Sequence, residues 1–189
     1  MNIVFIGMSG SGKSTFGAYC SKLLNMPLID LDAEICKNYG GSIPMIFSVG
    51  GEQLFRELEL HEALKAAAAD GAVIATGGGT VTNEEGMKAL KKSGLTVYLN
   101  CDAQTLCSRL CSDETERPLL KGESTLEQKV EEMLAAREPL YLKYADVVLN
   151  QSEIIKSRNL TEEELSVQLG ATYLELVLKL EKKVYAKFC

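Results

Sequence analysis

Short apolar stretches alternate with amphipathic stretches from the N-terminus of the chain to about residue 150. The apolar stretches are too short for helices and nearly continuous in hydrophobicity, which is typical of parallel strands covered by helices on both faces. We predict strands at residues 2–6, 27–30, 72–76, 96–100 and 146–149. The stretches that follow them have helical spacing, at residues 13–24, 53–69, 84–92, 103–111 and 126–142.

This alternation of strands and helices predicts an α/β fold of three layers, in which a five-stranded parallel sheet lies between helices and the crossovers are right-handed. Asp102 precedes one predicted helix as an N-cap, and Ser124 with Glu127 forms a capping box for the next. A chain of 189 residues is long enough for one packed domain, so we expect a single domain over residues 1–189.

Two segments fall outside this alternation. Residues 112–123 hold charged and turn-forming residues with little apolar material, so we expect a mobile lid at about residues 112–124. Thr161 begins an extra C-terminal helix, expected at about residues 161–186. Its apolar stripe would pack on the domain, and a helix that binds a partner is the alternative. The stripe consists of Leu165, Leu169, Thr172, Leu176, Leu180 and Val184.

Composition and charge exclude several classes of function. The net charge is −6 and there is no run of Lys and Arg, whereas a general nucleic-acid binder needs a basic surface. The apolar run at the N-terminus is too short for a signal peptide or a membrane span. The six cysteines lack Cys-x-x-Cys spacing, and Cys107 and Cys111 have only His61 as a possible imidazole partner for a metal. We expect a cytoplasmic protein with reduced thiols, without zinc, nucleic acid or membrane.

Residues 7–14 read Gly-Met-Ser-Gly-Ser-Gly-Lys-Ser and match the phosphate-binding pattern Gly-x-x-x-x-Gly-Lys-Ser between a strand and a helix. The glycines allow positive φ and bring backbone N–H groups close to phosphates, and the start of the helix points its positive end at the same anion. We expect Lys13 to reach the β- and γ-phosphates and Ser14 to bind Mg²⁺. The residues predicted to bind the nucleotide in this loop are Gly10, Ser11, Gly12, Lys13, Ser14 and Thr15.

Asp30 and Asp32 follow the second predicted strand. In an extended chain, residues two apart point to the same side, so both carboxylates would share one face at the carboxyl edge of the sheet, where ligands bind in open α/β folds. Such a pair suits one acid that organises the hydration shell of Mg²⁺ and another that accepts a hydroxyl proton. The alternative is a solvated turn or an N-cap, with Asp32 capping towards Ile35.

Three arginines and a run of glycines are further candidates. Arg56 has Glu59 three residues later on the same helical face, and an exposed pair of these two is the ordinary interpretation. The glycines at 77–79 directly follow a predicted strand and permit a ligand to lie against bare backbone, although a plain turn accepts them too. Arg117 lies in the long loop and Arg137 on the helix after it, and a surface role is the alternative for each arginine.

These motifs occur together in the order and spacing of one family, the shikimate kinases, which the chain resembles over residues 2–150. The segments that carry the resemblance, after the phosphate-binding loop, are Asp30-x-Asp32, Gly41-Ser42-Ile43-x-x-Ile46-Phe47, Gly51-Glu52-x-x-Phe55-Arg56-x-x-Glu59, Gly77-Gly78-Gly79 and Arg117-Pro118-Leu119-Leu120. The resemblance implies a P-loop kinase fold. It also implies transfer of the γ-phosphoryl group of ATP, with Mg²⁺, to the 3-hydroxyl of shikimate in aromatic amino-acid biosynthesis, by a monomer.

The resemblance also implies roles for individual residues. Asp32 would orient and deprotonate the 3-hydroxyl, with Lys13 and Arg117 as the other catalytic groups. The residues implied in binding are Arg56 and Arg137 on the shikimate carboxylate, Gly78 and Gly79 beside shikimate, Asp30 and Ser14 near Mg²⁺, Arg117 closing over the phosphates and Arg109 beside adenine. After Asn150 the resemblance weakens, because residues 151–155 lack the Arg/Pro-bearing loop that packs on adenine in the family.

Two other functions remain as alternatives. Another small-molecule P-loop kinase, such as a gluconate kinase, would suit the loop Met8-Ser9-Gly10-Ser11. A nucleotide-binding regulatory protein without transfer activity is the second. The segment from Gly51 to Arg56 and the glycines at 77–79 favour a shikimate kinase over the first alternative. An inactive protein is free to lose its catalytic groups, and this chain keeps Lys13, Ser14, Asp30, Asp32 and Arg117.

Overall fold

The structure, a computed structural model, describes residues 1–112, 118–120 and 125–151. The chain divides into two compact units, Met1–Ser152 and Glu153–Cys189. The C-terminal helix predicted at about residues 161–186 lies outside the described residues. So do Arg117 and most of the lid predicted at about residues 112–124.

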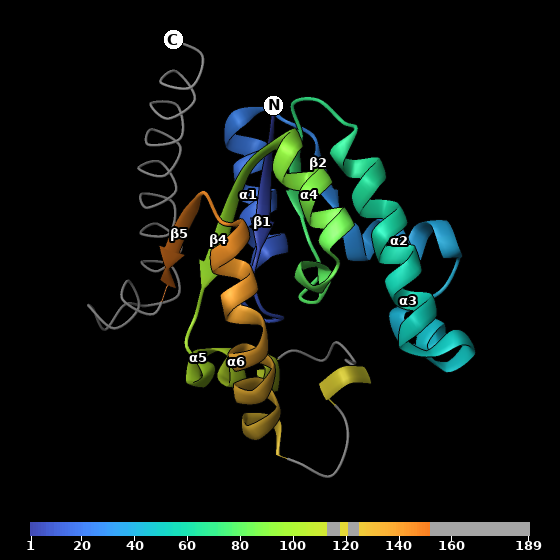
Figure 1. The fold of residues 1–189 in the computed structure, drawn as a ribbon, viewed down its shortest axis with the longest axis vertical. Coiled ribbons are helices and arrows are strands. Elements are labelled where there is room, and N and C mark those ends of the chain that lie inside the picture. Colours follow the sequence, from blue (N-terminus) through green and yellow to red (C-terminus); the bar gives the residue numbers. More distant parts are fainter. Residues whose placement is uncertain (113–117, 121–124, 152–189) are drawn as a thin grey trace. The chain divides into compact units, whose positions relative to one another are not determined.

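A parallel sheet of five strands forms the centre of the first unit, in the order β2-β3-β1-β4-β5 (Figure 1). The strands are β1 (Asn2–Ile6), β2 (Leu28–Asp30), β3 (Val73–Ala75), β4 (Gly94–Asn100) and β5 (Val147–Asn150). All four neighbouring pairs are parallel. The predicted sheet is confirmed, with β2 and β3 shorter than predicted and β4 beginning two residues earlier.

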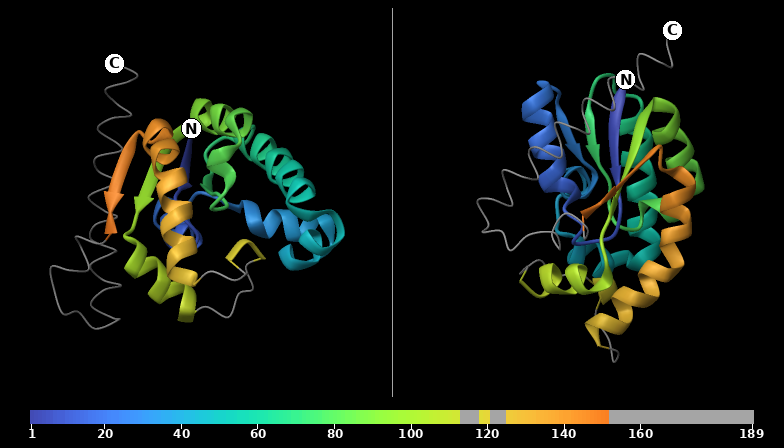
Figure 2. Two further views of the ribbon diagram at one scale, coloured as in Figure 1. Left: turned by 60° about the horizontal axis from the view of Figure 1, so that its bottom comes forward. Right: turned by 90° about the vertical axis from the view of Figure 1, so that its left-hand side faces the viewer.

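Helices cover both faces of this sheet. They are α1 (Lys13–Leu24), α2 (Leu31–Tyr39), α3 (Ile43–Ala67), α4 (Glu84–Ser93), α5 (Ala103–Ser112) and α6 (Leu126–Tyr144). Figure 2 shows α1 on one face of the sheet and α3, α4 and α6 on the other. The predicted three-layer arrangement is therefore confirmed. None of the described helices is long and apolar enough to span a membrane.

Alternating side chains of the central strand β1 point to opposite faces of the sheet and pack in the apolar layer on each face. Val4 and Ile6 belong to the main core together with Tyr141 of α6. Phe5 points to the opposite face, where its ring centroid lies 6.3 Å from that of Phe16 on α1. Because both faces are covered, every residue of β1 is buried, which explains the unbroken apolar sequence of this strand.

The helix α2 and the first part of α3, before residue 53, were not predicted. Asp30 caps α2, and Ser42 caps α3 by accepting a hydrogen bond from the Met45 N–H at 3.4 Å. Within α3 the backbone leaves helical geometry at Gly51, with φ of 65° and ψ of −163°. The helix therefore consists of two parts, and the predicted helix at residues 53–69 corresponds to the second part. Glycine accommodates this kink because a residue with a Cβ is strained at positive φ.

The two predicted N-caps had different outcomes. Asp102 is confirmed, since its Oδ1 accepts a hydrogen bond from the Thr105 N–H at 2.7 Å. The capping box of α6 forms one residue later than predicted, from Thr125 and Gln128 in place of Ser124 and Glu127. Both pairs satisfy the local spacing, so the pattern alone did not distinguish between them.

Candidate active site

The loop between β1 and α1 has the backbone conformation predicted from its glycines. Gly7, Gly10 and Gly12 have φ angles of 148°, 81° and 86°. A Cβ at Gly7 would lie 2.8 Å from the Leu99 carbonyl oxygen and 2.9 Å from Ser11 Oγ, so no side chain fits there. Gly12 is the N-cap of α1, and no side chain of the described residues caps the helix at this position. The N–H groups of the first turn are thus suited to bind an anion.

Lys13, the first residue of α1, is only 7% exposed. Its Nζ donates a hydrogen bond to the Met8 carbonyl oxygen at 2.9 Å, so the ammonium lies across the loop. Its charge lowers the pKa of Asp32, which places these two groups within electrostatic reach of one another. Ser14 and Thr15 follow on the first turn of α1, and both are exposed and accessible to a ligand.

Contrary to the prediction, the two aspartates do not lie in one extended strand. β2 ends at Asp30 and α2 begins at Leu31, so Asp32 lies in the first helical turn. The capping residue is Asp30, whose Oδ1 accepts a hydrogen bond from the Ala33 N–H at 3.2 Å, and not Asp32. The prediction that both aspartates point to the same side of an extended strand was therefore wrong. The two carboxylates still interact electrostatically, and the charge of Asp30 contributes to raising the pKa of Asp32.

The carboxylate of Asp32 is largely buried and incompletely hydrogen-bonded. Its Oδ1 is buried and has no hydrogen-bond partner in the part of the chain that the structure describes. A Cβ at Gly77 would lie 2.9 Å from this oxygen and 2.5 Å from Glu59 Oε1. Burial and the charge of Glu59 raise the pKa of Asp32 to about 6, against the opposing effect of Lys13 and Arg56. Such a carboxylate can accept a hydroxyl proton near neutral pH.

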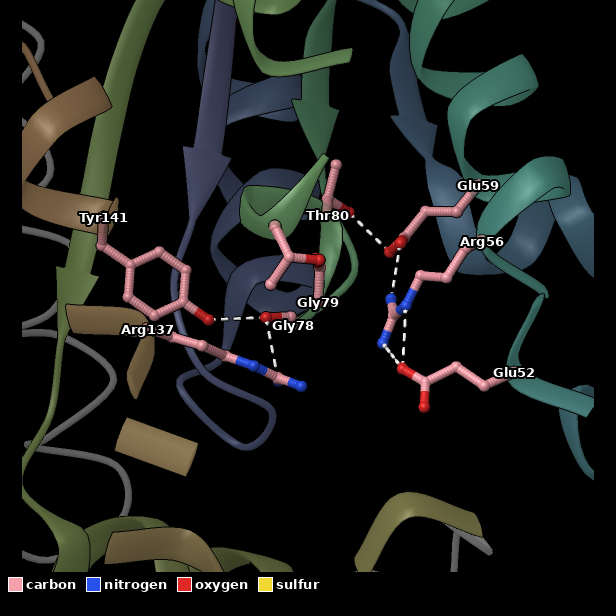
Figure 3. A network of polar contacts seen from close by, with 9 residues as sticks. Glu52, Arg56, Glu59, Gly78, Gly79, Thr80, Arg137 and Tyr141 are labelled. Carbon is pink, nitrogen blue, oxygen red and sulfur yellow. Dashed lines mark hydrogen bonds and ion pairs between the residues drawn. The ribbon is translucent and has the colours of Figure 1, made fainter. Parts of the chain in front are cut away.

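Arg56 is held between two carboxylates of its own helix, α3 (Figure 3). Its Nη1 lies 2.6 Å from Glu59 Oε2 and its Nη2 lies 3.0 Å from Glu52 Oε1. The side chains of Glu59 and Arg56 are 1% and 19% exposed, so the expected exposed pair is in fact a largely buried one. Burial opposes the charge of Arg56, but the two glutamates outweigh it and raise the pKa of Arg56. Thr80 Oγ1 donates to Glu59 Oε1 at 2.7 Å, which orients this carboxylate in turn.

The glycines after β3 let two arginines approach the same backbone. A Cβ at Gly79 would lie 2.5 Å from the guanidinium carbon of Arg56. The Gly78 carbonyl oxygen accepts hydrogen bonds from Arg137 Nη1 at 3.2 Å and from the Tyr141 hydroxyl at 2.5 Å. Figure 3 shows Arg56 and Arg137 on either side of this bare backbone. Two guanidinium groups placed in this way suit a small ligand that carries a carboxylate.

Arg109, predicted to lie beside adenine, is found at the phosphate-binding loop. It belongs to α5, and its Nη1 donates to the Gly10 carbonyl oxygen at 3.2 Å and to Gln151 Oε1 at 3.1 Å. Gln151 itself was not predicted, because a single glutamine after a strand forms no motif. The same is true of Tyr141, although its position four residues after Arg137 on a helix is a signal that both face the same side.

The loop, the buried carboxylate and the paired guanidinium groups lie at the carboxyl ends of β1, β2 and β3 and on the helices beside them. In open parallel sheets this edge carries the ligand site. Together with the phosphate-binding loop, the arrangement defines the class of protein, a P-loop kinase with a small acidic acceptor.

Comparisons with known proteins identify the family. The shikimate kinase family model matches residues 9–168. The chain is 38% identical to a shikimate kinase of Caldicellulosiruptor bescii over 169 residues, which are 89% of this chain and 96% of the relative. A shikimate kinase of Pseudomonas syringae pv. tomato is 40% identical over 152 residues, 80% of this chain and 87% of the relative. The structure of the Acinetobacter baumannii shikimate kinase in complex with shikimate is 32% identical, with a TM-score of 0.81 over 94% of this chain and 93% of that one.

The chain therefore belongs to the shikimate kinase family, and the resemblance drawn from its motifs is confirmed. A family match does not test single residues, so the roles that the resemblance implies for Asp30, Asp32, Arg56, Arg109 and Arg137 stay predictions.

The burial of the Arg56–Glu59 pair is testable by stability measurements. Replacing Glu59 by Gln keeps the shape and removes the charge that faces Arg56, so we expect the free energy of unfolding to fall by about 1–3 kcal/mol in urea denaturation at pH 7. Glu52→Gln is the matched control, since this partner is 53% exposed. Its loss should stay at or below about 1 kcal/mol. Equally small losses in both variants would contradict a buried pair.

Proposed function

We propose that the chain transfers the γ-phosphoryl group of ATP to the 3-hydroxyl of shikimate, with Asp32 as the base that accepts the hydroxyl proton. The observation that carries this assignment is the buried Asp32 Oδ1, which has no partner among the described residues and lies close to Gly77, beside the glycines that Arg56 and Arg137 approach. Membership in the family and the related structure with bound shikimate support this acceptor.

The nucleotide phosphates bind at residues 10–15. Backbone N–H groups of this loop and the N-terminus of α1 face the anion, and Lys13 exchanges its contact with the Met8 carbonyl for phosphate oxygens. Its ammonium then stabilises the charge that spreads over the transferred group. Arg109 contacts the nucleotide from α5. We assign Arg117 to the same phosphates, although it lies outside the described residues.

The residues at this edge fit Mg²⁺. The hydroxyl of Ser14 is exposed on the first turn of α1, and the half-buried carboxylate of Asp30 ends β2, with one oxygen acting as the cap of α2. Hydroxyl and carboxylate oxygens, completed by water and phosphate, are the ligands that Mg²⁺ prefers. Ser14 would hold the ion directly and Asp30 through its hydration shell. The bound ion supplies neutralisation of the phosphate oxygens.

The acceptor is held by charge and geometry. Arg56 and Arg137 bind the shikimate carboxylate, and the glutamates on either side of Arg56 keep its guanidinium in one orientation before the substrate arrives. Asp32, with a pKa of about 6, is mostly ionised at neutral pH and still basic enough to take the proton. Because phosphoryl transfer needs alignment more than covalent participation, the rigid placement of these groups accounts for most of the catalysis that the protein supplies.

The cellular setting is part of the same proposal. We propose a cytoplasmic monomer that binds small molecules and no nucleic acid. The described cysteines Cys20, Cys36, Cys101, Cys107 and Cys111 are free thiols, as expected in a reducing compartment. The net charge of −6 is unfavourable for contact with phosphate backbones.

The acceptor is tested by a coupled assay of ADP release from MgATP, with shikimate, gluconate and nucleoside monophosphates offered in parallel. We expect shikimate to be the only one of these acceptors that gives turnover, and we expect that turnover to be lost when Mg²⁺ is chelated. Turnover with gluconate or a nucleoside monophosphate in place of shikimate would refute the proposed acceptor.

The role of Asp32 is tested by the pH dependence of kcat/KM for shikimate. Below the pKa of about 6 the protonated carboxyl cannot accept a proton, so activity should fall about tenfold per pH unit on the acidic side. Asp32→Asn should lower turnover by about 10²–10⁴-fold and abolish this acidic limb. The dissociation constant for ADP serves as the control and should stay nearly unchanged. An identical acidic limb in the variant would exclude Asp32 as the base.

The role of Arg56 is tested by calorimetric titration of shikimate and ADP. Arg56→Lys loses the planar fork and Arg56→Ala loses the charge as well, so shikimate binding should weaken in that order, by about 2–5 kcal/mol for Arg56→Ala. Lys88→Ala, at an exposed pair with Glu84 on α4, is the control and should leave both affinities unchanged. Unaltered shikimate affinity in Arg56→Ala would leave a kinase of unknown acceptor.

A further inference from the structure

Gln151, the residue directly after β5, connects two parts of the nucleotide end that are far apart in the sequence. Its side chain is completely buried. The amide Nε2 donates a hydrogen bond to the Ser11 carbonyl oxygen at 2.7 Å, and Oε1 accepts one from Arg109 Nη1 at 3.1 Å. Arg109 Nη1 also donates to the Gly10 carbonyl oxygen at 3.2 Å. One amide therefore contacts the phosphate-binding loop both directly and through an arginine.

The chemistry of the two partners determines which way the amide faces. A guanidinium group offers only donors, so it must face Oε1, and a backbone carbonyl only accepts, so it must face Nε2. Among the other residue types, glutamate offers only acceptors when ionised, and methionine fills the volume without forming strong hydrogen bonds. Because the site is buried, a partner that is left unsatisfied there bears the full cost of desolvation. Glutamine is thus the side chain of this length that satisfies both neighbours.

The contact with Ser11 orients a donor of the phosphate site. The Ser11 carbonyl and the Gly12 N–H belong to one planar trans peptide unit, in which the two groups point in opposite directions. Holding the carbonyl against Gln151 therefore directs the Gly12 N–H away from it. The preceding peptide unit is held at both ends, since Arg109 binds the Gly10 carbonyl and the Ser11 N–H donates to the Met8 carbonyl oxygen at 3.1 Å. With glycines on both sides, this segment would otherwise have wide conformational freedom.

The backbone that carries Gln151 is itself fixed to the sheet. Asn100 at the end of β4 donates from Nδ2 to Asn150 Oδ1 at 2.9 Å, and its own Oδ1 accepts from the Tyr98 hydroxyl at 3.1 Å. The Tyr98 ring stacks on Tyr141, with centroids 4.9 Å apart. The backbone next to Gln151 is thus linked to the packed core through Asn100 and Tyr98.

We propose that Gln151 is a positioning residue of the nucleotide site, which holds the Ser11–Gly12 peptide unit and Arg109 in the orientation that receives ATP. The inference rests on the proposed nucleotide site at residues 10–15. It assigns a role at the nucleotide end to a residue in the very segment where the family's adenine-binding loop is missing from the sequence. Both hydrogen bonds of the Gln151 side chain go to the nucleotide end, to Ser11 and Arg109, so its loss should affect the nucleotide and spare shikimate.

The test uses Gln151→Met, which keeps the volume and removes both hydrogen bonds. We expect the dissociation constant for ADP and the KM for ATP to rise about three- to tenfold, as for the loss of a buried hydrogen bond, while the dissociation constant and KM for shikimate stay within about twofold. The matched control is Gln104→Met, the same change at an exposed position of α5, which should alter neither.

Unchanged ADP affinity, or an equal loss for ADP and shikimate, would overturn the role, because the second result indicates a general structural effect. If Gln151→Met does not fold, the same titrations on the isosteric Gln151→Glu decide, and weakened ADP binding with normal shikimate binding is again expected. ADP titration does not depend on catalysis, so a wild-type chain that fails to phosphorylate shikimate would refute the proposed acceptor without deciding this inference.

Discussion

Bare backbone at the ends of β1 and β3 is the constraint on which the active site depends. A Cβ at Gly7 would collide with the Leu99 carbonyl, one at Gly77 with the carboxylates of Asp32 and Glu59, and one at Gly79 with the guanidinium of Arg56. Because glycines leave this space free, the side chains of Asp32, Glu59 and Arg56 can approach the backbone after β3 closely. Phosphoryl transfer depends on such close and fixed alignment.

Buried charge is the second organising feature. Glu59 lies inside the protein and is compensated by Arg56 and Thr80, so its cost of desolvation is offset by directed contacts. The same carboxylate helps to raise the pKa of Asp32 to about 6, after burial as the main cause. One buried anion therefore orients the arginine assigned to the substrate and tunes the acid assigned as the base. Both effects depend on Glu59, a residue that has no proposed contact with the substrate.

The two ends of the site are held by different parts of the fold. Arg56 and Glu59 lie on α3 shortly after the kink at Gly51, where Phe55 packs in a small separate core with Ile35 and Ile46. The phosphate-binding loop is held from the opposite edge of the sheet, through Arg109 on α5 and Gln151 after β5. The central strand β1 lies between them, so each substrate has its own supporting elements on a shared sheet.

Local patterns in the sequence determined the five strands, most of the helices, the phosphate-binding loop and the family, because short periodicities and glycine spacing act within a few residues. They did not determine α2, whose first turn holds Asp32. They also did not determine the register of the capping box of α6, since two local pairs of residues have the same spacing. Tertiary packing alone decided that Glu59 is buried and that Gln151 reaches Ser11, 140 residues away in the chain. Burial and contacts at such separations depend on the strand order of the whole sheet, which no local pattern records.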